Sequence, residues 1–593
     1  MRTLKLSENA LRVLEARYLR RDTQRRIVET PEQLFERVAR AIAHAELLLG
    51  NARQAAYWQD EFYKLLVSLE FIPNSPTLMN AGVPLGQLSA CFVLPVEDTM
   101  EGIFEAIKQM ALVQRTGGGT GFSFSKLRPK GDVVASTGGE ASGPVSFMKI
   151  FDCVTEYIKQ GGKRRGANMG VLRVDHPDIL ELITAKLDGT SLQNFNISIG
   201  VTDAFLKAVR QDQRYDLIHP GTGKPVGQLR AKQVFDTIVE AAWRVGDPGL
   251  LFLDTINRAN PTPHLGSIEA TNPCGEIPLL PYESCNLGSI NLARMVREYN
   301  DHVEVDWVKL LDTVRKAIRF LDDVIEVNKY PVPEIERMTR GNRKIGLGIM
   351  GFAELLIRLN ISYDSEEAVG LAERIMHAIA SEALKVAQEL AEERGVFPNW
   401  KGSIYETRGI KVRNATCTAI APTGTLSILA NTSASIEPLF ALAYQRKHVL
   451  GDQTLREINP IFLEYLQRYG LNVEEIVEKI LEKGRLKDIE KVPEGLKRLF
   501  TTALEIPPER HLQIQAAFQR HVDNSVSKTI NLPQDATPQD VARAYWRAWE
   551  LGLKGITIYR YGSKSTQVLE LGVNEKAHHY DHASKCDPEE CRV

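Results

Sequence analysis

Cysteine is scarce in this sequence, and long apolar runs are missing. Seven cysteines among 593 residues are too few for a disulfide framework, so each is expected to be either a buried apolar residue or a chemically active one. No apolar run reaches the roughly 18 residues of a membrane span, and the N-terminus lacks the apolar stretch of a signal peptide. We therefore expect a cytoplasmic protein that does not enter a membrane.

An excess of charge of one sign is also missing. The 73 Lys and Arg residues against 75 Asp and Glu residues give a net charge of −2, which removes the main electrostatic argument for binding long nucleic acids. We expect no DNA partner, and any bound nucleotide should be small. The hydrophobic fraction of 43% is ordinary for a globular chain that buries a large core.

Three regions of the chain differ in how their apolar, polar, Gly and Pro residues are distributed. Residues 1–70 carry apolar positions at helical spacing and predict an N-terminal helical region. Residues 71–563 alternate loops rich in Gly and Pro, β-branched runs such as residues 196–202, and amphipathic helices, which indicates an α/β catalytic body. Residues 564–593 are polar and predict a flexible tail.

Two helices of the body can be placed from their apolar periodicity. One spans about residues 307–327. The other is expected to begin with a capping box of Asp364 and Glu367 and to end at Gly395. Its apolar stripe predicts packing into the core rather than a cofactor site.

The most informative segment is residues 271–279. Asn272, Cys274 and Glu276 alternate there and would project to one side of an extended loop, so that an amide, a thiol and a carboxylate converge. The alternative interpretation is that Cys274 is a small buried residue beside a turn, as single cysteines commonly are. The polar neighbours on the same side weaken that alternative.

Two further cysteines complete a recognisable set. Cys285 lies in the run Glu-Ser-Cys-Asn-Leu, and Cys91 lies upstream between apolar residues of strand type. Each by itself would be interpreted as a core residue, but with the Asn-x-Cys-x-Glu segment they resemble the catalytic elements of ribonucleotide reductases. The resemblance extends from about residue 70 to the C-terminus. Further motifs match that family in the same order, at residues 74–82, 117–123, 162–168, 342–348 and 421–427.

The resemblance implies a fold and a set of chemical roles. The fold would be a ten-stranded α/β barrel whose inner finger loop carries the thiyl cysteine. Cys274 would hold the transient thiyl radical that takes the 3′-hydrogen of a ribonucleotide, Glu276 would accept the 3′-hydroxyl proton, and Asn272 would fix the ribose hydroxyls. Cys91 and Cys285 would be the reducing pair, closing to a disulfide as the 2′-hydroxyl leaves as water.

The tail carries a second pair, Cys586 and Cys591. By the resemblance, this pair would carry electrons from a thioredoxin-type reductant to the buried disulfide. The flexible chain from residue 563 to Cys586 would reach roughly 25–30 Å, enough to enter an active site from the surface. Tail decoration, or zinc binding together with nearby histidines, is the alternative.

The substrate would be a ribonucleoside di- or triphosphate, with the diphosphate expected. Phosphate binding requires backbone N–H groups and hydroxyls, which the loop around Thr423 offers near a predicted helix start. As a bare Thr/Gly loop this segment would be only a turn. By the family pattern, the substrate-binding residues are Ser75, Ala90, Gly119, Pro422, Thr423, Gly424, Thr425 and Leu426.

Reductases of this family choose among substrates by reading a deoxynucleoside triphosphate effector at a second site, a coupling between two ligands. The candidates for effector binding are Asp98, Lys126 and Arg128, with Lys163 and Arg164 in the communicating loop. A solvated charge run is the alternative interpretation of the last two. Effector binding at a helical interface predicts a homodimer.

The radical source separates the classes of the family. Large subunits that need a separate radical-generating subunit carry an adjacent Tyr-Tyr pair near the C-terminus, whereas Arg560 separates Tyr559 from Tyr561 here. Together with the sequence Asn-Pro-Cys-Gly-Glu, this separation of the two tyrosines favours adenosylcobalamin as the cofactor. No metal-ligand set of the protein itself is predicted, and the large subunit of a class I reductase is the alternative.

Two more distant alternatives belong to other functional classes. A glycyl-radical enzyme on a similar barrel would need a C-terminal glycine-radical loop, but the Gly562 segment is too slight a match, and a tail with a cysteine pair stands there instead. A nucleotide sensor without catalytic activity could keep the effector site alone. The complete set around Asn272, Cys274 and Glu276 argues against a sensor.

Overall fold

The computed structural model describes residues 4–134, 138–160, 164–300, 302–446, 455–483 and 485–563. The chain forms two compact units. Among the described residues, one unit lies within residues 4–440 and 501–563, and the other lies within residues 441–500. Within the described ranges, no helix is long and apolar enough to cross a membrane.

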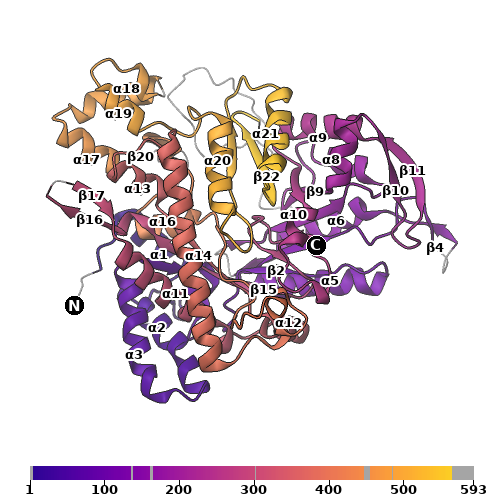
Figure 1. The fold of residues 1–593 in the computed structure, drawn as a ribbon, viewed down its shortest axis with the longest axis horizontal. Coiled ribbons are helices and arrows are strands. Elements are labelled where there is room, and N and C mark those ends of the chain that lie inside the picture. Colours follow the sequence, from indigo (N-terminus) through magenta and orange to yellow (C-terminus); the bar gives the residue numbers. More distant parts are fainter. Residues whose placement is uncertain are drawn as a thin grey trace. The chain divides into compact units, whose positions relative to one another are not determined.

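The N-terminal helical region contains α1 (Glu8–Arg17), α2 (Pro31–Leu48) and α3 (Ala52–Val67). A capping box of Thr30 and Gln33 starts α2. Helices α2 and α3 pack with α11 (Trp307–Val327), and α11 packs with α14 (Glu366–Arg394), around one large apolar cluster (Figure 1). This packing attaches the helical region firmly to the catalytic body.

Both helices expected in the body are present. Helix α11 covers the predicted range, and α14 ends at Gly395, whose φ is +83°. The predicted N-cap at Asp364 is wrong by one residue, because Ser365 Oγ accepts the backbone N–H of Ala368 and α14 begins at Glu366. Asp364 instead forms an ion pair with Arg510.

Five parallel strands form one half of a barrel. They are, in spatial order, β2 (Cys91–Val93), β3 (Gly119–Ser123), β8 (Asn168–Arg173), β9 (Phe195–Val201) and β12 (Gly249–Phe252). The intervening helices include α5 (Met100–Arg115), α6 (Pro144–Tyr157), α8 (Asp203–Arg210) and α9 (Ala231–Val245), which pack on the strands through a second apolar cluster. The β-branched run at residues 196–202 is indeed a strand, β9.

The other half of the barrel runs antiparallel to the first. Strand β15 joins β2, and β22 joins β12, both in antiparallel pairing. The strands of this half are β15 (Ser284–Asn291), β18 (Ile345–Met350), β21 (Thr529–Leu532) and β22 (Gly555–Arg560), with β1 (Phe71–Pro73) paired to the end of β15.

Residues 416–420 close the barrel between β18 and β21. Thr418 bridges Leu347 of β18, and Ile420 bridges Val526 just before β21, both in parallel direction. The segment therefore acts as the closing strand. The predicted ten-stranded α/β barrel is confirmed.

A hairpin of β13 (Ala270–Thr271) and β14 (Pro278–Leu279) lies inside the barrel. We call residues 270–279 the finger. A Cβ atom on Gly121 of β3 would lie only 1.7 Å from the carbonyl oxygen of Thr271. Strand β3 thus carries glycine where the backbone of the finger takes the place of a side chain.

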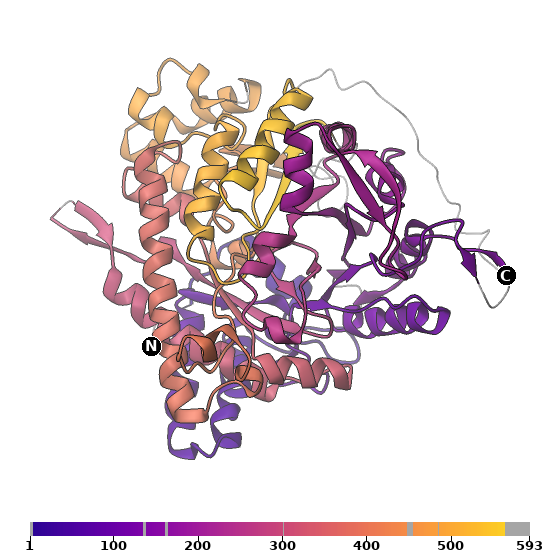
Figure 2. The same ribbon diagram turned by 45° about the vertical axis from the view of Figure 1, so that its right-hand side comes forward.

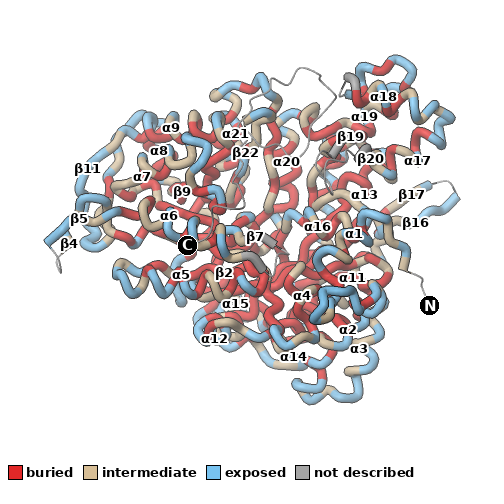
Figure 3. The backbone as a smooth tube through the Cα atoms, turned by 180° about the vertical axis from the view of Figure 1, so that it is seen from behind, coloured by how far each residue is buried: buried red, intermediate tan, exposed pale blue. Residues whose placement is uncertain are grey.

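The remaining elements of this unit connect or cover the barrel strands. Helix α21 packs beside α9, and the hairpin of β10 and β11 is largely exposed (Figures 2 and 3). The remaining elements are α4 (Ser75–Asn80), β4 (Val133–Val134), β5 (Gly139–Glu140), β6 (Lys159–Gln160), β7 (Arg164–Arg165), α7 (Ile179–Thr184), β10 (Arg214–Ile218), β11 (Pro225–Arg230), α10 (Leu253–Arg258), β16 (Val296–Tyr299), β17 (His302–Val305), α12 (Pro333–Asn342), α13 (Phe352–Arg358), α15 (Ile404–Thr407), α16 (Gly424–Ala430), α20 (Pro508–Gln519) and α21 (Pro538–Glu550).

The second unit is small and helical with one hairpin. Its elements are β19 (Ala443–Arg446), β20 (Leu455–Ile458), α17 (Pro460–Arg468), α18 (Val473–Lys483) and α19 (Glu494–Leu499). The rings of Phe462 and Tyr465 each meet Phe500 edge to face, with centroids 5.0 and 5.4 Å away. These aromatic contacts supply its core.

Candidate active site

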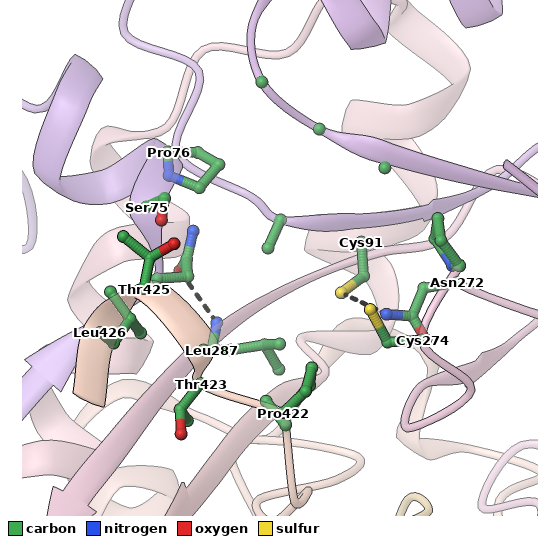
Figure 4. A pocket seen from close by; sticks show the side chains of 18 of the residues that line it. Ser75, Pro76, Cys91, Asn272, Cys274, Leu287, Pro422, Thr423, Thr425 and Leu426 are labelled. Atoms are coloured by element: carbon green, nitrogen blue, oxygen red, sulfur yellow. Dashed lines mark hydrogen bonds between the residues drawn. The ribbon is translucent and has the colours of Figure 1, made fainter. Parts of the chain in front are cut away.

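A pocket of about 350 Å³ lies at the tip of the finger. Its lining divides into two parts. Figure 4 shows Cys91, Asn272 and Cys274 on one side, and Ser75 and Thr425 on the other. The pocket therefore has a thiol end and a hydroxyl end.

Asn272 ties the finger to the barrel wall at the thiol end. Its Nδ2 donates to Cys91 Sγ over 3.1 Å, and its Oδ1 accepts the backbone N–H of Ile277 over 3.0 Å. Asn196 Nδ2 of β9 donates to the Pro273 carbonyl over 2.8 Å. These bonds fix the turn that carries Cys274.

The three finger residues differ in exposure. Asn272 and Glu276 are buried at 2% exposure, whereas Cys274 is exposed. The carbonyl of Glu276 accepts the Ser525 N–H over 2.8 Å, which holds the backbone at this residue against the chain just before β21. The finger thus presents one accessible thiol above a buried amide and carboxylate.

Cys91 and Cys285 are direct cross-strand partners on β2 and β15. Paired residues of antiparallel strands have Cα atoms roughly 4.5–5.5 Å apart, which lies within the range that a disulfide spans. Burial raises the pKa of the Cys285 thiol well above its ordinary value. The pair can therefore close to a disulfide, and Cys285 is kept as a thiol until then.

A buried ion pair beside Cys285 is not indicated by the sequence. Lys344 Nζ lies 2.7 Å from Glu283 Oε2, with both side chains at most 2% exposed. Lys344 lowers the pKa of Cys285 and so opposes the effect of burial, while Glu276 and Glu283 act in the same direction as burial. Lys344 falls in the motif at residues 342–348, but only the parallel pairing of β15 and β18 brings it to this place.

The hydroxyl end is built from the starts of two short helices. Thr423 has φ +49° and precedes α16, so the predicted helix start is confirmed. Its Oγ1 accepts the Ser435 N–H over 2.8 Å. Thr425 lies in the first turn of α16, and Ser75 begins α4.

The predicted substrate-binding residues all line this one pocket: Ser75, Ala90, Gly119, Pro422, Thr423, Gly424, Thr425 and Leu426. Gly119 donates its N–H to the Ala90 carbonyl over 2.8 Å. A Cβ atom on Gly119 would lie 2.9 Å from Pro273 Cγ, so glycine leaves the space that the finger needs.

Two lining residues come from the helical region and were not anticipated from the sequence. Arg17 Nη1 donates to Thr425 Oγ1 over 3.2 Å, and Tyr18 Oη shares a hydrogen bond of 2.8 Å with Ser75 Oγ. No motif signals them, because their place depends on how α1 packs against α16.

The candidate effector residues form a separate group at the start of α5. Arg128 Nε lies 2.8 Å from Asp98 Oδ2, and Lys126 Nζ lies 2.9 Å from Glu97 Oε1. Lys163 lies outside the described residues. Arg164 pairs through its backbone with Gln160, and its side chain is not described.

The tail cysteines Cys586 and Cys591 also lie outside the described residues. The five cysteines within the described ranges include the complete barrel set of Cys91, Cys274 and Cys285. The geometry of the barrel set therefore stands independently of the tail.

Comparison with protein families gives matches over nearly the whole chain. The family model described as "Ribonucleotide reductase, barrel domain" matches residues 89–413 and 405–559. The model described as "Ribonucleotide reductase, all-alpha domain" matches residues 4–86. Both the barrel and the helical region thus have counterparts in one family.

Individual relatives agree with the family match. A protein of Thermoplasma acidophilum named vitamin B12-dependent ribonucleoside-diphosphate reductase is 51% identical, over 96% of this chain and 81% of the relative. A protein of Mycobacterium tuberculosis with the same name is 52% identical, over 95% and 81%. The solved structure of an Actinobacillus ureae class Id ribonucleotide reductase alpha subunit has a TM-score of 0.76 and 27% identity, over 94% of this chain and 97% of that one.

Proposed function

Since the chain belongs to the ribonucleotide reductase family, we propose that it reduces ribonucleoside diphosphates to 2′-deoxyribonucleotides with adenosylcobalamin, for DNA synthesis. One observation carries the chemistry. An accessible finger thiol, Cys274, lines the same pocket as Cys91, whose cross-strand partner is Cys285. One thiol can therefore carry the radical while two other thiols supply the electrons for reduction.

The finger residues have distinct tasks in the proposed reaction. Cys274 as a thiyl radical takes the 3′-hydrogen of the ribose and later returns it. Glu276, buried on the same finger, accepts the 3′-hydroxyl proton. Asn272, already held by Ile277 and Cys91, positions the ribose hydroxyls without having to reorganise.

Cys91 and Cys285 supply the two electrons. Each thiol contributes one hydrogen equivalent, an S–S bond forms, and the 2′-hydroxyl leaves as water. The high pKa of Cys285 keeps a proton available until that step. Cys586 and Cys591 then reduce the disulfide by thiol exchange and are themselves reduced by a thioredoxin-type protein.

Adenosylcobalamin is favoured by the relatives named vitamin B12-dependent and by the separation of Tyr559 from Tyr561 on and after β22. When bound, it supplies the radical that converts the Cys274 thiol to a thiyl. The exposure of Cys274 fits a bulky group that approaches the finger tip from outside. Buried Glu276 and Asn272 would stay shielded from that group.

The phosphate end of the substrate is assigned to the hydroxyl end of the pocket. Ser75, Thr425 and the backbone from Pro422 to Leu426 face this space. The ribose then lies between Ala90, Gly119 and the thiols. The diphosphate is preferred as the substrate because the two relatives are named diphosphate reductases.

Regulation and assembly are part of the proposal. A deoxynucleoside triphosphate would bind at Asp98, Lys126 and Arg128 and act through the loop of Lys163 and Arg164. Asp98 and Arg128 form an ion pair just before α5, and Lys126 pairs with the neighbouring Glu97. Large apolar side chains stand exposed on α5 and α6, among them Met100, Phe104 and Tyr157. A homodimer in the cytoplasm that buries these helices would place the effector at its interface.

Anaerobic turnover tests the proposal. The protein is incubated with a small dithiol, an effector and either CDP or CTP, with and without adenosylcobalamin, and deoxycytidine products are quantified by chromatography. We expect product only with the cofactor, and a higher kcat/KM for CDP. Product that appears only after a second, radical-generating subunit is added would refute the cofactor assignment.

A further inference from the structure

Arg17 is a cation placed at the hydroxyl end of the pocket by the N-terminal helical region. It is the last residue of α1, and its Nη1 donates to Thr425 Oγ1 over 3.2 Å. Among the pocket-lining residues that the structure describes, Arg17 is the only cation and Glu276 the only acid. The two charges belong to opposite ends of the lining, since Thr425 marks the hydroxyl end and Glu276 lies on the finger.

The fold holds Arg17 in this place. Leu14, one helical turn before Arg17, and Tyr18, directly after it, are buried in the large apolar cluster that the helical region shares with α11 and α14. The Tyr18 hydroxyl meets Ser75 Oγ at 2.8 Å, so the same helix end contacts two hydroxyl residues of the pocket, Ser75 and Thr425. Helix α1 packs directly against α16.

The guanidinium has hydrogen-bonding capacity to spare. Arg17 is exposed, and within the described part of the chain it forms no ion pair, whereas Arg12 on the same helix pairs with Glu8 at 2.6 Å. A guanidinium offers five N–H donors, and one contact to a neutral hydroxyl uses one of them. A phosphate oxygen is a far stronger partner for the rest.

We propose that Arg17 is a substrate-binding residue that pairs with the 5′-diphosphate of the ribonucleotide, so that the helical region contributes the positive charge of the phosphate site. The inference rests on the proposed function, because it takes the pocket as the substrate site. Hydroxyls and backbone N–H groups position the phosphates, and Arg17 neutralises part of their charge. A diphosphate gains this stabilisation, and a nucleoside does not.

Equilibrium binding of CDP and of cytidine, measured by NMR titration without cofactor, tests the assignment. Loss of a hydrogen bond to a charged group weakens binding by about tenfold or more. We expect Arg17→Gln to weaken CDP binding by about that factor and to leave cytidine binding within about twofold. Arg17→Lys, which keeps the charge, should lie between Arg17→Gln and the wild type.

Arg12→Gln is the matched control, since it removes an exposed arginine from the same helix outside the pocket. It should leave both affinities and the unfolding midpoint unchanged. An equal loss of CDP and cytidine binding in Arg17→Gln, or no loss of CDP binding, would overturn the inference. Turnover of CDP by the wild-type protein is measured alongside, so a failure of the proposed function is recognised separately.

Discussion

The close approach of the finger to β3 allows a sharp test of how the finger positions Cys274. A Cβ atom added at Gly121 would lie 1.7 Å from the Thr271 carbonyl oxygen, and the obstacle is backbone rather than a flexible side chain. Contacts below 3.0 Å are essentially never seen for real Cβ atoms. Gly121→Ala must therefore separate finger and strand by at least about 1.3 Å.

A displacement of that size acts directly on catalysis. A misplacement of about 1 Å can cost about 100-fold in rate, so we expect the kcat of Gly121→Ala for CDP to fall by roughly this factor or more. Forcing the extra methyl into the barrel should also cost about 1–3 kcal/mol of stability. Deoxynucleotide formation measures the first effect, and denaturant unfolding measures the second.

Gly370→Ala is the matched control. Gly370 lies within α14, and an added Cβ atom there meets nothing within 4 Å. Replacing this helical glycine by alanine should leave kcat unchanged and raise stability by up to about 1 kcal/mol. If Gly121→Ala kept kcat within about threefold of the wild type, the finger would not depend on β3 for its position, and the reasoning would be refuted.

Three further predictions concern the finger thiol, the tail cysteines and one buried carboxyl group. Cys274→Ser should abolish turnover while the affinity for CDP stays nearly unchanged, whereas Cys153→Ser, at another exposed cysteine, should leave turnover intact. Activity of Cys274→Ser above about 3% of the wild-type rate would correspond to a barrier increase of only about 2 kcal/mol and would contradict the radical role. When Cys586 and Cys591 are both replaced by serine, a thioredoxin-type reductant should support one turnover per site and no more, and a small dithiol should restore turnover. Steady turnover with the protein reductant would exclude electron transfer through the tail cysteines. Burial raises the pKa of Glu354 to about 7 from an ordinary value of 4.5, so its ionisation does not affect stability below pH 4.5 and destabilises the fold as the pH rises to 7. The free energy of unfolding of Glu354→Gln should therefore rise by about 3 kcal/mol relative to that of the wild type between pH 4.5 and pH 8. A difference between the two proteins that does not change with pH would contradict this assignment.

The features that the sequence determined by itself depend on short-range pattern. The range of α11 follows from apolar periodicity, and the end of α14 follows from Gly395, whose positive φ suits a residue without a side chain. The finger was expected only through the family resemblance, and residues 273–276 form a turn rather than the extended loop that the alternation of Asn272, Cys274 and Glu276 predicted. The one-residue error at Asp364 has a local cause, because two adjacent polar side chains compete for one cap and only their rotamers decide between them.

What only the tertiary structure decided involves residues far apart along the chain. Cys91 and Cys285 become partners through the register of β2 and β15, and a register is set by the packing of whole strands rather than by either cysteine. Lys344 reaches Cys285 through the pairing of β15 with β18. Arg17 reaches the pocket because α1 docks on α16, and its own neighbours in the sequence predict only a helix. Such contacts come from burying the apolar faces of separate elements against one another, a non-directional force that leaves no mark at the polar residues it brings together.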